Sequence, residues 1–311
     1  MRRHIPVLMN EVVAALQPES PRNSRLIDGT VGGGGHSRAL LGAGVDAVLA
    51  IDRDARAIET AGQALAAYGD SVNFHHGSYI DMQAAARALG WQTVDSILLD
   101  LGLSSYQLDD PARGFSFRFD APLDMRFDRD EAGDTAGDLV NGLAADELAE
   151  IFFRYGEERH SRRIAREIVR QRPITTTRML AEAVADAVPA QSKRRSRVHP
   201  ATKVFQALRI AVNKELDAVE RVIPIAIDLL RPGGRLAVIT FHSLEDRLVK
   251  QAFKRLATSV VAPPGMASIE ERRASIRLVN RKPISPDQAE ESANPRSRSA
   301  KLRVVERLQA P

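Results

Sequence analysis

The chain has 311 residues, of which 44% are hydrophobic and 27% charged, and its net charge is +4 at pH 7. This composition is typical of a globular protein with one large and one smaller domain. The lack of cysteine excludes disulfides and thiolate metal sites and suits the reducing cytoplasm, which is the expected location. No segment reaches the roughly 20 apolar residues of a membrane helix, so neither export nor membrane insertion is expected.

Short apolar strands alternate with helical segments along the first third of the chain. This rhythm predicts a parallel sheet with right-handed crossovers, the doubly wound α/β class. The predicted strands cover residues 25–28, 46–51, 72–75 and 94–99, and the predicted helices cover 36–41, 54–68 and 82–89.

The rhythm breaks after Leu101, where a polar stretch rich in aromatic and turn residues is followed by helical patterns without strands. An inserted helical subdomain over residues 108–202 is the simplest explanation, with 1–107 and 203–311 forming the sheet domain. Apolar residues then recur at helical spacing from Phe205 to Leu230, and Pro224 should kink or split this helix. The sheet resumes with strands at 235–241, 276–279 and 302–305, a helix at 244–256, and loops at 261–274 and 283–299.

A glycine-rich turn between the first strand and the first helix is a candidate nucleoside site. TVGGGGH follows shortly after Asp28, and Asp52 ends the next strand. Glycines allow close approach of the backbone to a ligand, and a carboxylate at the second strand's end can accept hydrogen bonds from both ribose hydroxyls.

The strict dinucleotide fingerprint G-x-G-x-x-G fails, because Ser37 and Arg38 stand where its last glycine should be. An acid before the glycines suits the ammonium group of a methionine-based cofactor, whereas it would repel a pyrophosphate. The pattern therefore favours S-adenosylmethionine, held by Asp28 and Asp52. The alternative is that Asp28 caps the turn and the glycines merely close it.

The sequence DLGLSS, which starts at Asp100, follows the fourth strand, at the edge of an open sheet where ligands bind. Methyl transfer from a sulfonium requires an acceptor atom that is held in line at near-attack distance. Asp100, Ser104 and Ser105 are candidate catalytic residues, since each could accept a hydrogen bond from an exocyclic amine. The alternative for the serines is that they cap the following segment.

Basic residues cluster twice in stretches rich in serine and proline, which favours a polyanionic partner over solvated loops. One cluster holds Lys193, Arg194, Arg195, Arg197 and His199, and the other holds Arg296, Arg298, Lys301 and Arg303.

Other residues could contact RNA or serve the fold. Arg113, Phe115 and Phe117 combine a base with aromatic rings that could stack on a splayed nucleotide, and core packing is the alternative. His242 follows the fifth strand and is expected on the acceptor side, where it contacts RNA, relays a proton or serves the structure. No metal is expected in the protein, and at His199 no second ligand stands at a suitable spacing.

Several blocks, in order along nearly the whole chain, resemble the bacterial RsmH (MraW) family. They include HIPVL, DGTVGGGGHS, AIDRD, ILLDLGLSS, RGFSF, PLDMR, YGEER, HPATKVFQALRIAVN, PGGRLAVITFHSLEDR and NPRSRSAKLR. The resemblance implies a Rossmann-like class I methyltransferase that uses S-adenosyl-L-methionine to methylate the exocyclic N4 of a cytidine in the decoding region of small-subunit ribosomal RNA. It also implies cofactor contacts at Gly34, Gly35, His36, Asp52, Tyr79, Asp100 and Gln107. Relatives often carry Phe at the position of Tyr79, which keeps the aromatic face for the adenine.

Three classes of function compete: a nucleic-acid methyltransferase, a methyltransferase with another substrate, and a non-catalytic RNA-binding ribosome assembly factor. The basic clusters argue against a small substrate, and the glycine turn with Asp52 argues against a purely structural role. The expected partner is ribosomal RNA or the small ribosomal subunit, and the sequence is compatible with a homodimer.

Overall fold

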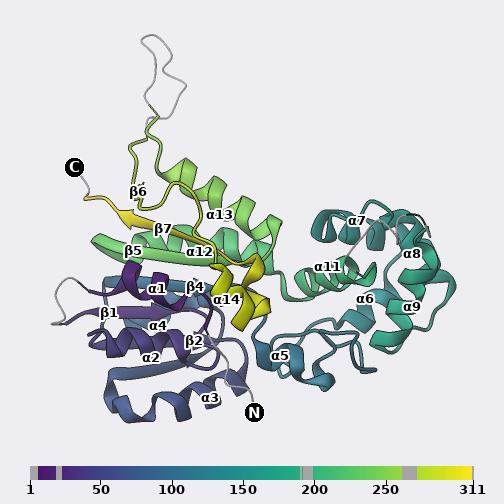
Figure 1. Cartoon of the computed structure of the whole chain (residues 1–311), viewed down its shortest axis with the longest axis horizontal. Helices are drawn as coiled ribbons and strands as arrows, with labels where there is room; N and C mark the ends of the chain where they lie inside the picture. Colours follow the sequence, from purple (N-terminus) through teal and green to yellow (C-terminus); the bar gives the residue numbers. More distant parts are fainter. Residues whose placement is uncertain (1–5, 19–22, 190, 192–198, 261–271, 310–311) are drawn as a thin grey trace, which may run out of the picture. The chain divides into compact units, whose positions relative to one another are not determined.

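The computed structural model describes residues 6–18, 23–189, 191, 199–260 and 272–309 (Figure 1). The chain divides into two compact units. The first, Met1–Gly102 with Leu216–Pro311, is called the sheet unit, and the second, Leu103–Glu215, is called the helical unit.

The sheet unit is built on a seven-stranded sheet in the order β3-β2-β1-β4-β5-β7-β6. Strands β1 to β5 run parallel, whereas β7 is antiparallel to both of its neighbours. The strand order reverses between β1 and β4, so the predicted doubly wound, Rossmann-like α/β class is confirmed. The strands are β1 (Arg25–Asp28), β2 (Ala47–Asp52), β3 (Val72–His76), β4 (Val94–Asp100), β5 (Leu230–Thr240), β6 (Ile276–Leu278) and β7 (Lys301–Arg307).

Successive side chains of each strand point to opposite faces of the sheet, and helices cover both faces. Leu26 and Val48 lie in one core with residues of α1 (Met9–Leu16), α2 (Gly35–Gly42) and α3 (Ala55–Leu65). Ile27 and Leu49 lie in the opposite core with residues of α4 (Met82–Ala88), α12 (Glu215–Leu229) and α13 (Ser243–Leu256). The unit also contains α14 (Gln288–Ala293) and the short 3-10 helices Ala66–Ser71, Tyr79–Asp81 and Pro295–Ser299.

The helical unit has its own core, formed by large apolar residues such as Phe152, Ile164 and Leu208. Helix α7 packs against α8 and α11. At Gly156 the backbones of α7 and α11 come so close that an added Cβ would lie 2.6 Å from the carbonyl oxygen of Lys203. The helices are α5 (Ser105–Asp109), α6 (Ala136–Gly142), α7 (Ala145–Gly156), α8 (Ser161–Arg170), α9 (Thr177–Ala187) and α11 (Ala201–Asn213), with a 3-10 turn at Pro111–Arg113.

The boundaries of the inserted unit differ from those predicted. The chain divides after Gly102 and after Glu215, not after residues 107 and 202. The predicted long helix is broken at Lys214, which has a left-handed φ of 52°, whereas Pro224 lies inside α12. The first part of the predicted helix belongs to the inserted unit because its apolar face packs into the core of that unit.

Two further expectations concern loops and membrane spans. The segment 283–299, predicted as a loop, contains α14 and a 3-10 helix. Within the described ranges, no helix is both long and apolar enough to cross a membrane.

Candidate cofactor site

The glycine turn after β1 is tied to both neighbouring strands through its backbone. The N–H of Gly29 donates to the carbonyl of Leu98 in β4, and the N–H of Val31 donates to that of Ile51 in β2, both at 2.9 Å. Gly32 and Gly34 have φ values of 50° and 76°, a region that favours glycine. The turn therefore has the conformation that only its glycines adopt without strain.

Asp52, at the end of β2, holds the turn from the side. Its Oδ2 accepts the N–H of Gly32 at 2.9 Å, and its Oδ1 accepts the N–H of Asp54 at 2.9 Å. Burial raises the pKa of Asp52 to about 6, although these hydrogen bonds lower it. Each carboxylate oxygen can accept a second hydrogen bond, so Asp52 can bind a ligand while it holds the turn.

Asp28, the last residue of β1, is 1% exposed. Its Oδ2 accepts the Ser37 hydroxyl at 2.6 Å, and its Oδ1 accepts the N–H of Thr30 at 3.3 Å. Burial raises the pKa of Asp28 to about 6, against the lowering effect of these two donors, and the charge of Asp52 raises it further. The alternative that Asp28 supports the turn therefore has a structural basis, because its contacts lie within the turn and the following helix.

Asp100 ends β4, the strand next to β1 in the sheet. Its N–H donates to the Thr30 hydroxyl at 2.7 Å. Its Oδ1 is buried, and no donor among the described residues reaches it. Burial raises the pKa of Asp100 to about 8, and the charges of Asp28 and Glu245 raise it further.

His36 lies beside Asp100 at the start of α2. Its Nε2 lies 2.9 Å from the carbonyl of Val7, which can only accept, so Nε2 carries the proton. Its Nδ1 lies 3.8 Å from Oδ2 of Asp100. A Cβ on the preceding Gly35 would lie 2.3 Å from Cγ of Pro6, so the N-terminal segment packs directly on this turn.

Tyr79 is also close to the turn. It begins a 3-10 helix just after β3, and a Cβ on Gly29 would lie 3.1 Å from the Tyr79 Cβ. The predicted contacts Asp28, Gly34, Gly35, His36, Asp52, Tyr79 and Asp100 therefore all lie in or beside the turn, at the carboxyl ends of β1 to β4.

These residues fit S-adenosylmethionine. The cofactor carries two cationic groups and a ribose diol, and the site offers three carboxylates, one with an unpartnered buried oxygen. A pyrophosphate would meet these same carboxylates as like charges. The donor set therefore favours a cationic nucleoside.

Ser104, Ser105 and Gln107 lie in the helical unit. Ser104 Oγ accepts the N–H of Gln107 at 3.2 Å, and Gln107 Oε1 accepts the N–H of Ser104 at 3.1 Å. The two residues thus form a capping box for α5, which is the structural alternative for Ser104. The roles of Ser105 in catalysis and of Gln107 in cofactor binding stay predictions.

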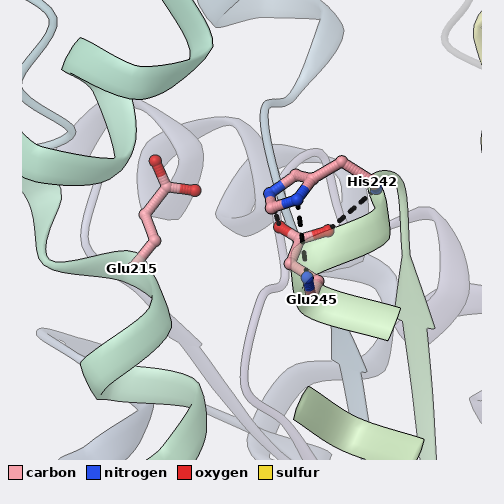
Figure 2. A group of neighbouring side chains, drawn as sticks. All are labelled: Glu215, His242 and Glu245. Atoms are coloured by element: carbon pink, nitrogen blue, oxygen red, sulfur yellow. Dashed lines mark hydrogen bonds and ion pairs between the residues drawn. The ribbon is translucent and has the colours of Figure 1, made fainter. Parts of the chain in front are cut away.

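His242 caps helix α13 together with Glu245 (Figure 2). Its Nδ1 accepts the N–H of Glu245 at 3.4 Å, and its Nε2 lies 3.0 Å from Oε1 of Glu245. Oε2 of Glu245 accepts the N–H of Phe241 at 2.9 Å. Glu215, also drawn in Figure 2, belongs to the helical unit, where it pairs with Arg209 at 2.8 and 2.9 Å. These contacts give His242 a structural role.

Arg113 and Phe115 are buried in the helical unit, 4% and 7% exposed. Nη2 of Arg113 donates to the carbonyls of Arg126 and Phe127, and the rings of Phe115 and Phe127 lie 5.8 Å apart. Both residues therefore pack inside the helical unit, which is the alternative to RNA contact.

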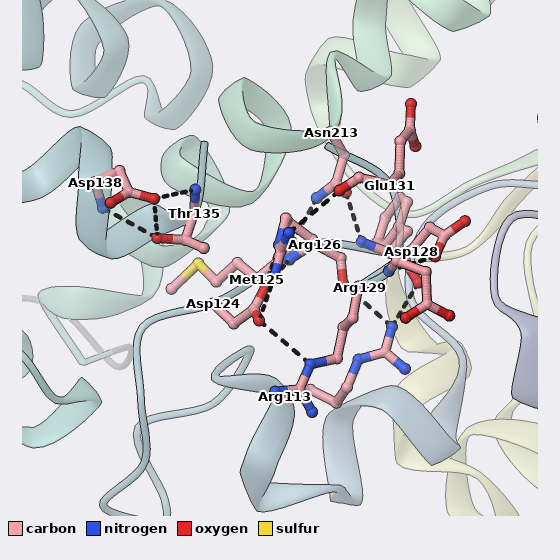
Figure 3. Close-up of polar contacts among 12 residues, drawn as sticks. Arg113, Asp124, Met125, Arg126, Asp128, Arg129, Glu131, Thr135, Asp138 and Asn213 are labelled. Atoms are coloured by element: carbon pink, nitrogen blue, oxygen red, sulfur yellow. Dashed lines mark hydrogen bonds and ion pairs between the residues drawn. The ribbon is translucent and has the colours of Figure 1, made fainter. Parts of the chain in front are cut away.

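A polar network holds the irregular segment 120–135 around these residues (Figure 3). Asp124 pairs with Arg126 at 2.9 Å and with Arg129 at 3.3 Å. Asn213 donates to the carbonyl of Met125 at 2.7 Å and accepts the N–H of Phe127 at 2.8 Å. Asn213 was not among the predicted residues, although it ends the block HPATKVFQALRIAVN.

The two predicted basic clusters differ in how much of each the structure describes. Lys193, Arg194, Arg195 and Arg197 lie outside the described residues. In the second cluster, Lys301 and Arg303 pair with Asp246 at 3.1 and 2.8 Å. This pair of bases therefore has an internal partner.

Thr30 and Ser37 are further residues of this site that were not predicted. Thr30 positions Asp100, and Ser37 positions Asp28. Both stand inside the block DGTVGGGGHS, where small hydroxyl residues flank the glycines, and that position was the available signal.

Comparisons with known proteins agree along the whole chain. A family model described as the MraW methylase family matches residues 1–308. A curated ribosomal RNA small subunit methyltransferase H from Syntrophotalea carbinolica is 50% identical over 312 residues, which cover 98% of both chains. Its namesake from Thermomicrobium roseum is 50% identical over 311 residues, which cover 98% of this chain and 94% of that one.

One similarity to a solved structure is much weaker. An rRNA methylase from Streptococcus thermophilus matches with a TM-score of 0.42 and 11% identity, over 97% of this chain and 94% of that chain. The fold assignment rests on the sheet order instead. The family model and the relatives at half identity decide the assignment: the chain belongs to the MraW methylase family.

Proposed function

We propose that this methylase transfers the methyl group of S-adenosylmethionine to the exocyclic N4 of a cytidine in the decoding region of small-subunit ribosomal RNA. Membership of the family makes the chain a methylase, and the names of its relatives support small-subunit ribosomal RNA as the substrate. The choice of N4 and of the decoding region comes from the sequence resemblance. The work would take place in the cytoplasm, where ribosomal subunits are assembled.

One observation carries the cofactor assignment: three carboxylates end neighbouring strands around a glycine turn. Asp52 would accept hydrogen bonds from the ribose hydroxyls, and Tyr79 would offer an aromatic face to the adenine. Asp28 and Asp100 would place negative charge near the cationic groups of the cofactor. The raised pKa of Asp100 means that its carboxyl is protonated more readily than an ordinary one in the cofactor-free protein. A cation at its unpartnered oxygen would lower this pKa, because an opposite charge favours the ionised form.

The cofactor supplies an electrophilic methyl group on its sulfonium. The protein then has to hold the amine in line with that methyl, and no covalent intermediate is needed, because an exocyclic nitrogen requires no activation of the ring. The chain has no cysteine that could attack the pyrimidine. Asp100 is proposed to accept a hydrogen bond from the amine and to orient it.

Calorimetric titration of the full chain with S-adenosylmethionine tests the cofactor site. Asp52→Ala should weaken binding about 10- to 100-fold for each hydrogen bond that the ligand loses to this charged group. Asp54→Ala is the matched control, since it removes a neighbouring carboxylate that caps α3. No binding by the unaltered chain, or equal losses in both variants, would contradict the proposal.

The role of Asp100 has a separate test. Asp100→Ala should lower kcat far more than it weakens RNA binding, because the proposed hydrogen bond orients the amine and does not bind the RNA backbone. Equal losses in turnover and in RNA affinity would count against this role. An assembly factor without catalysis, the competing class, would bind RNA but transfer no methyl group in the same assay.

A further inference from the structure

Helix α8 separates an apolar face from a strongly basic one. Its buried residues are Ser161, Ile164, Ala165 and Ile168, which pack into the core of the helical unit. The residues between them include three exposed arginines, Arg162, Arg163 and Arg166, which we call the α8 arginine face. Arg166 stands one helical turn beyond the other two, so the three share one side of the helix.

The charge of the α8 arginine face is not balanced from within. Among the described residues, no carboxylate oxygen lies within 4.0 Å of any of these three guanidinium groups. Glu167, the one acid in α8, accepts hydrogen bonds from Arg170 and Gln171, although the charge of Arg163 also acts on it. The first turn of the helix contains no acid.

This arrangement costs stability locally. Like charges three or four residues apart on a helix repel each other by a few tenths of a kcal/mol per pair. Cations in the first turn are also unfavourable, because that end of the helix carries positive partial charge. The fold of the unit does not require these side chains, since its core contacts come from the opposite face. An external anion would offset the repulsion.

Arginine fits one kind of anion better than others. Its planar guanidinium forms paired hydrogen bonds with phosphate oxygens and stays charged at all relevant pH values. A row of such groups along one turn of a helix suits a partner with regularly spaced phosphates. Small anions would need only one of the three.

We propose that the α8 arginine face binds the phosphate backbone of the ribosomal RNA substrate. The inference rests on the proposed function for its partner, and it assigns an RNA contact to a helix that neither predicted basic cluster includes. The contact positions the RNA without reading its sequence, because phosphate contacts carry no base information.

The test compares two double variants of the full chain. Arg162→Gln/Arg166→Gln removes two charges from the face and keeps a good helix former at both positions. Arg87→Gln/Arg221→Gln removes the same charge from exposed helical positions of the sheet unit, one of them beside Glu220. Binding to an in vitro transcript of small-subunit ribosomal RNA is measured by fluorescence anisotropy at several KCl concentrations.

Each phosphate contact on a single strand contributes about 0.7 to the slope of log affinity against log salt. The face variant should therefore flatten the slope by about 1.4, so that a tenfold rise in salt weakens the parent about 25-fold more than the variant. The control variant should keep the parent's slope. In methylation assays the face variant should raise KM for RNA and keep both kcat and cofactor affinity.

An unchanged slope in the face variant, or an equal flattening in the control variant, would overturn the proposal. A fall in kcat without a change in KM would do the same, since it would place the arginines in the chemical step. Failure of the proposed function has a different signature: the parent would bind no S-adenosylmethionine and transfer no methyl group. The salt dependence of RNA binding by the face variant and the control variant would still show whether the α8 arginine face contacts phosphates.

Discussion

Replacing Asp100 by asparagine should remove a pH dependence from the stability of the cofactor-free protein. The folded-state pKa of Asp100 is raised from 3.8 to about 8, chiefly by burial. A carboxyl with a raised folded-state pKa contributes stability that is fully present below its unfolded pKa and is lost as the pH rises through the folded pKa. The contribution of Asp100 therefore falls between about pH 4 and pH 8.

The size of the effect follows from the proton count. In this range the folded protein keeps one proton that the unfolded chain has released, so the free energy of unfolding falls by about 1.4 kcal/mol for each pH unit. Between pH 6 and pH 7.5 the loss from Asp100 alone is about 2 kcal/mol. Asp100→Asn keeps the shape of the side chain and has no proton to lose, so its loss over this interval should be smaller by that amount.

Urea denaturation of parent and variant at pH 6 and pH 7.5, without cofactor, measures both free energies of unfolding. Asp28 and Asp52 also titrate near pH 6, and they are present in both proteins. Equal losses of stability in parent and variant would refute the reasoning, because Asp100 would then ionise in the folded protein as it does in the unfolded chain.

Three further predictions concern residues that stabilise the glycine turn, the segment around Met125 and helix α13. Gly34→Ala should lower the free energy of unfolding by about 1–2 kcal/mol, because Gly34 has a φ of 76°. Gly62→Ala should raise it by about 0.5–1 kcal/mol, because an added Cβ inside α3 would meet nothing within 4 Å. Thermal denaturation that ranks the two variants in the opposite order would contradict this. Asn213→Ala should cost about 2–4 kcal/mol in urea denaturation, because it leaves the carbonyl of Met125 and the N–H of Phe127 without their partner. An unchanged midpoint would show that these two hydrogen bonds do not stabilise the helical unit. His242→Ala should cost about 1 kcal/mol and His242→Asn much less, since asparagine also caps helices; equal melting temperatures in the two variants would argue against the cap.

The sheet unit could be predicted well because its signals are local. Alternating apolar strands and helices, the glycine turn and the acid at the end of β2 each lie within a short stretch of sequence. The positions of Asp28, Asp52 and Asp100 then follow from parallel pairing, which brings the carboxyl ends of the strands to one edge.

Other features depend on packing that no local pattern encodes. The apolar spacing runs unbroken from Phe205 to Leu230, so the break at Lys214 and the assignment of α11 to the helical unit were missed. Phe115 stands in a motif typical of RNA-binding surfaces, yet its burial depends on Phe127 and the surrounding helices. Within α8, the buried residues Ile164 and Ala165 separate Arg162 and Arg163 from Arg166, so the three arginines form no continuous run in the sequence and share one face only in the helix.

The central claim is tested most directly by mapping methyl groups on the RNA. Small ribosomal subunits from cells that lack the chain are incubated with the purified protein and S-adenosylmethionine, and their RNA is analysed by mass spectrometry of nuclease fragments. We expect one cytidine of the decoding region to gain a single methyl group on its exocyclic N4. RNA that gains no methyl group, or a methyl group on another nucleotide or on a ring atom, would contradict the account.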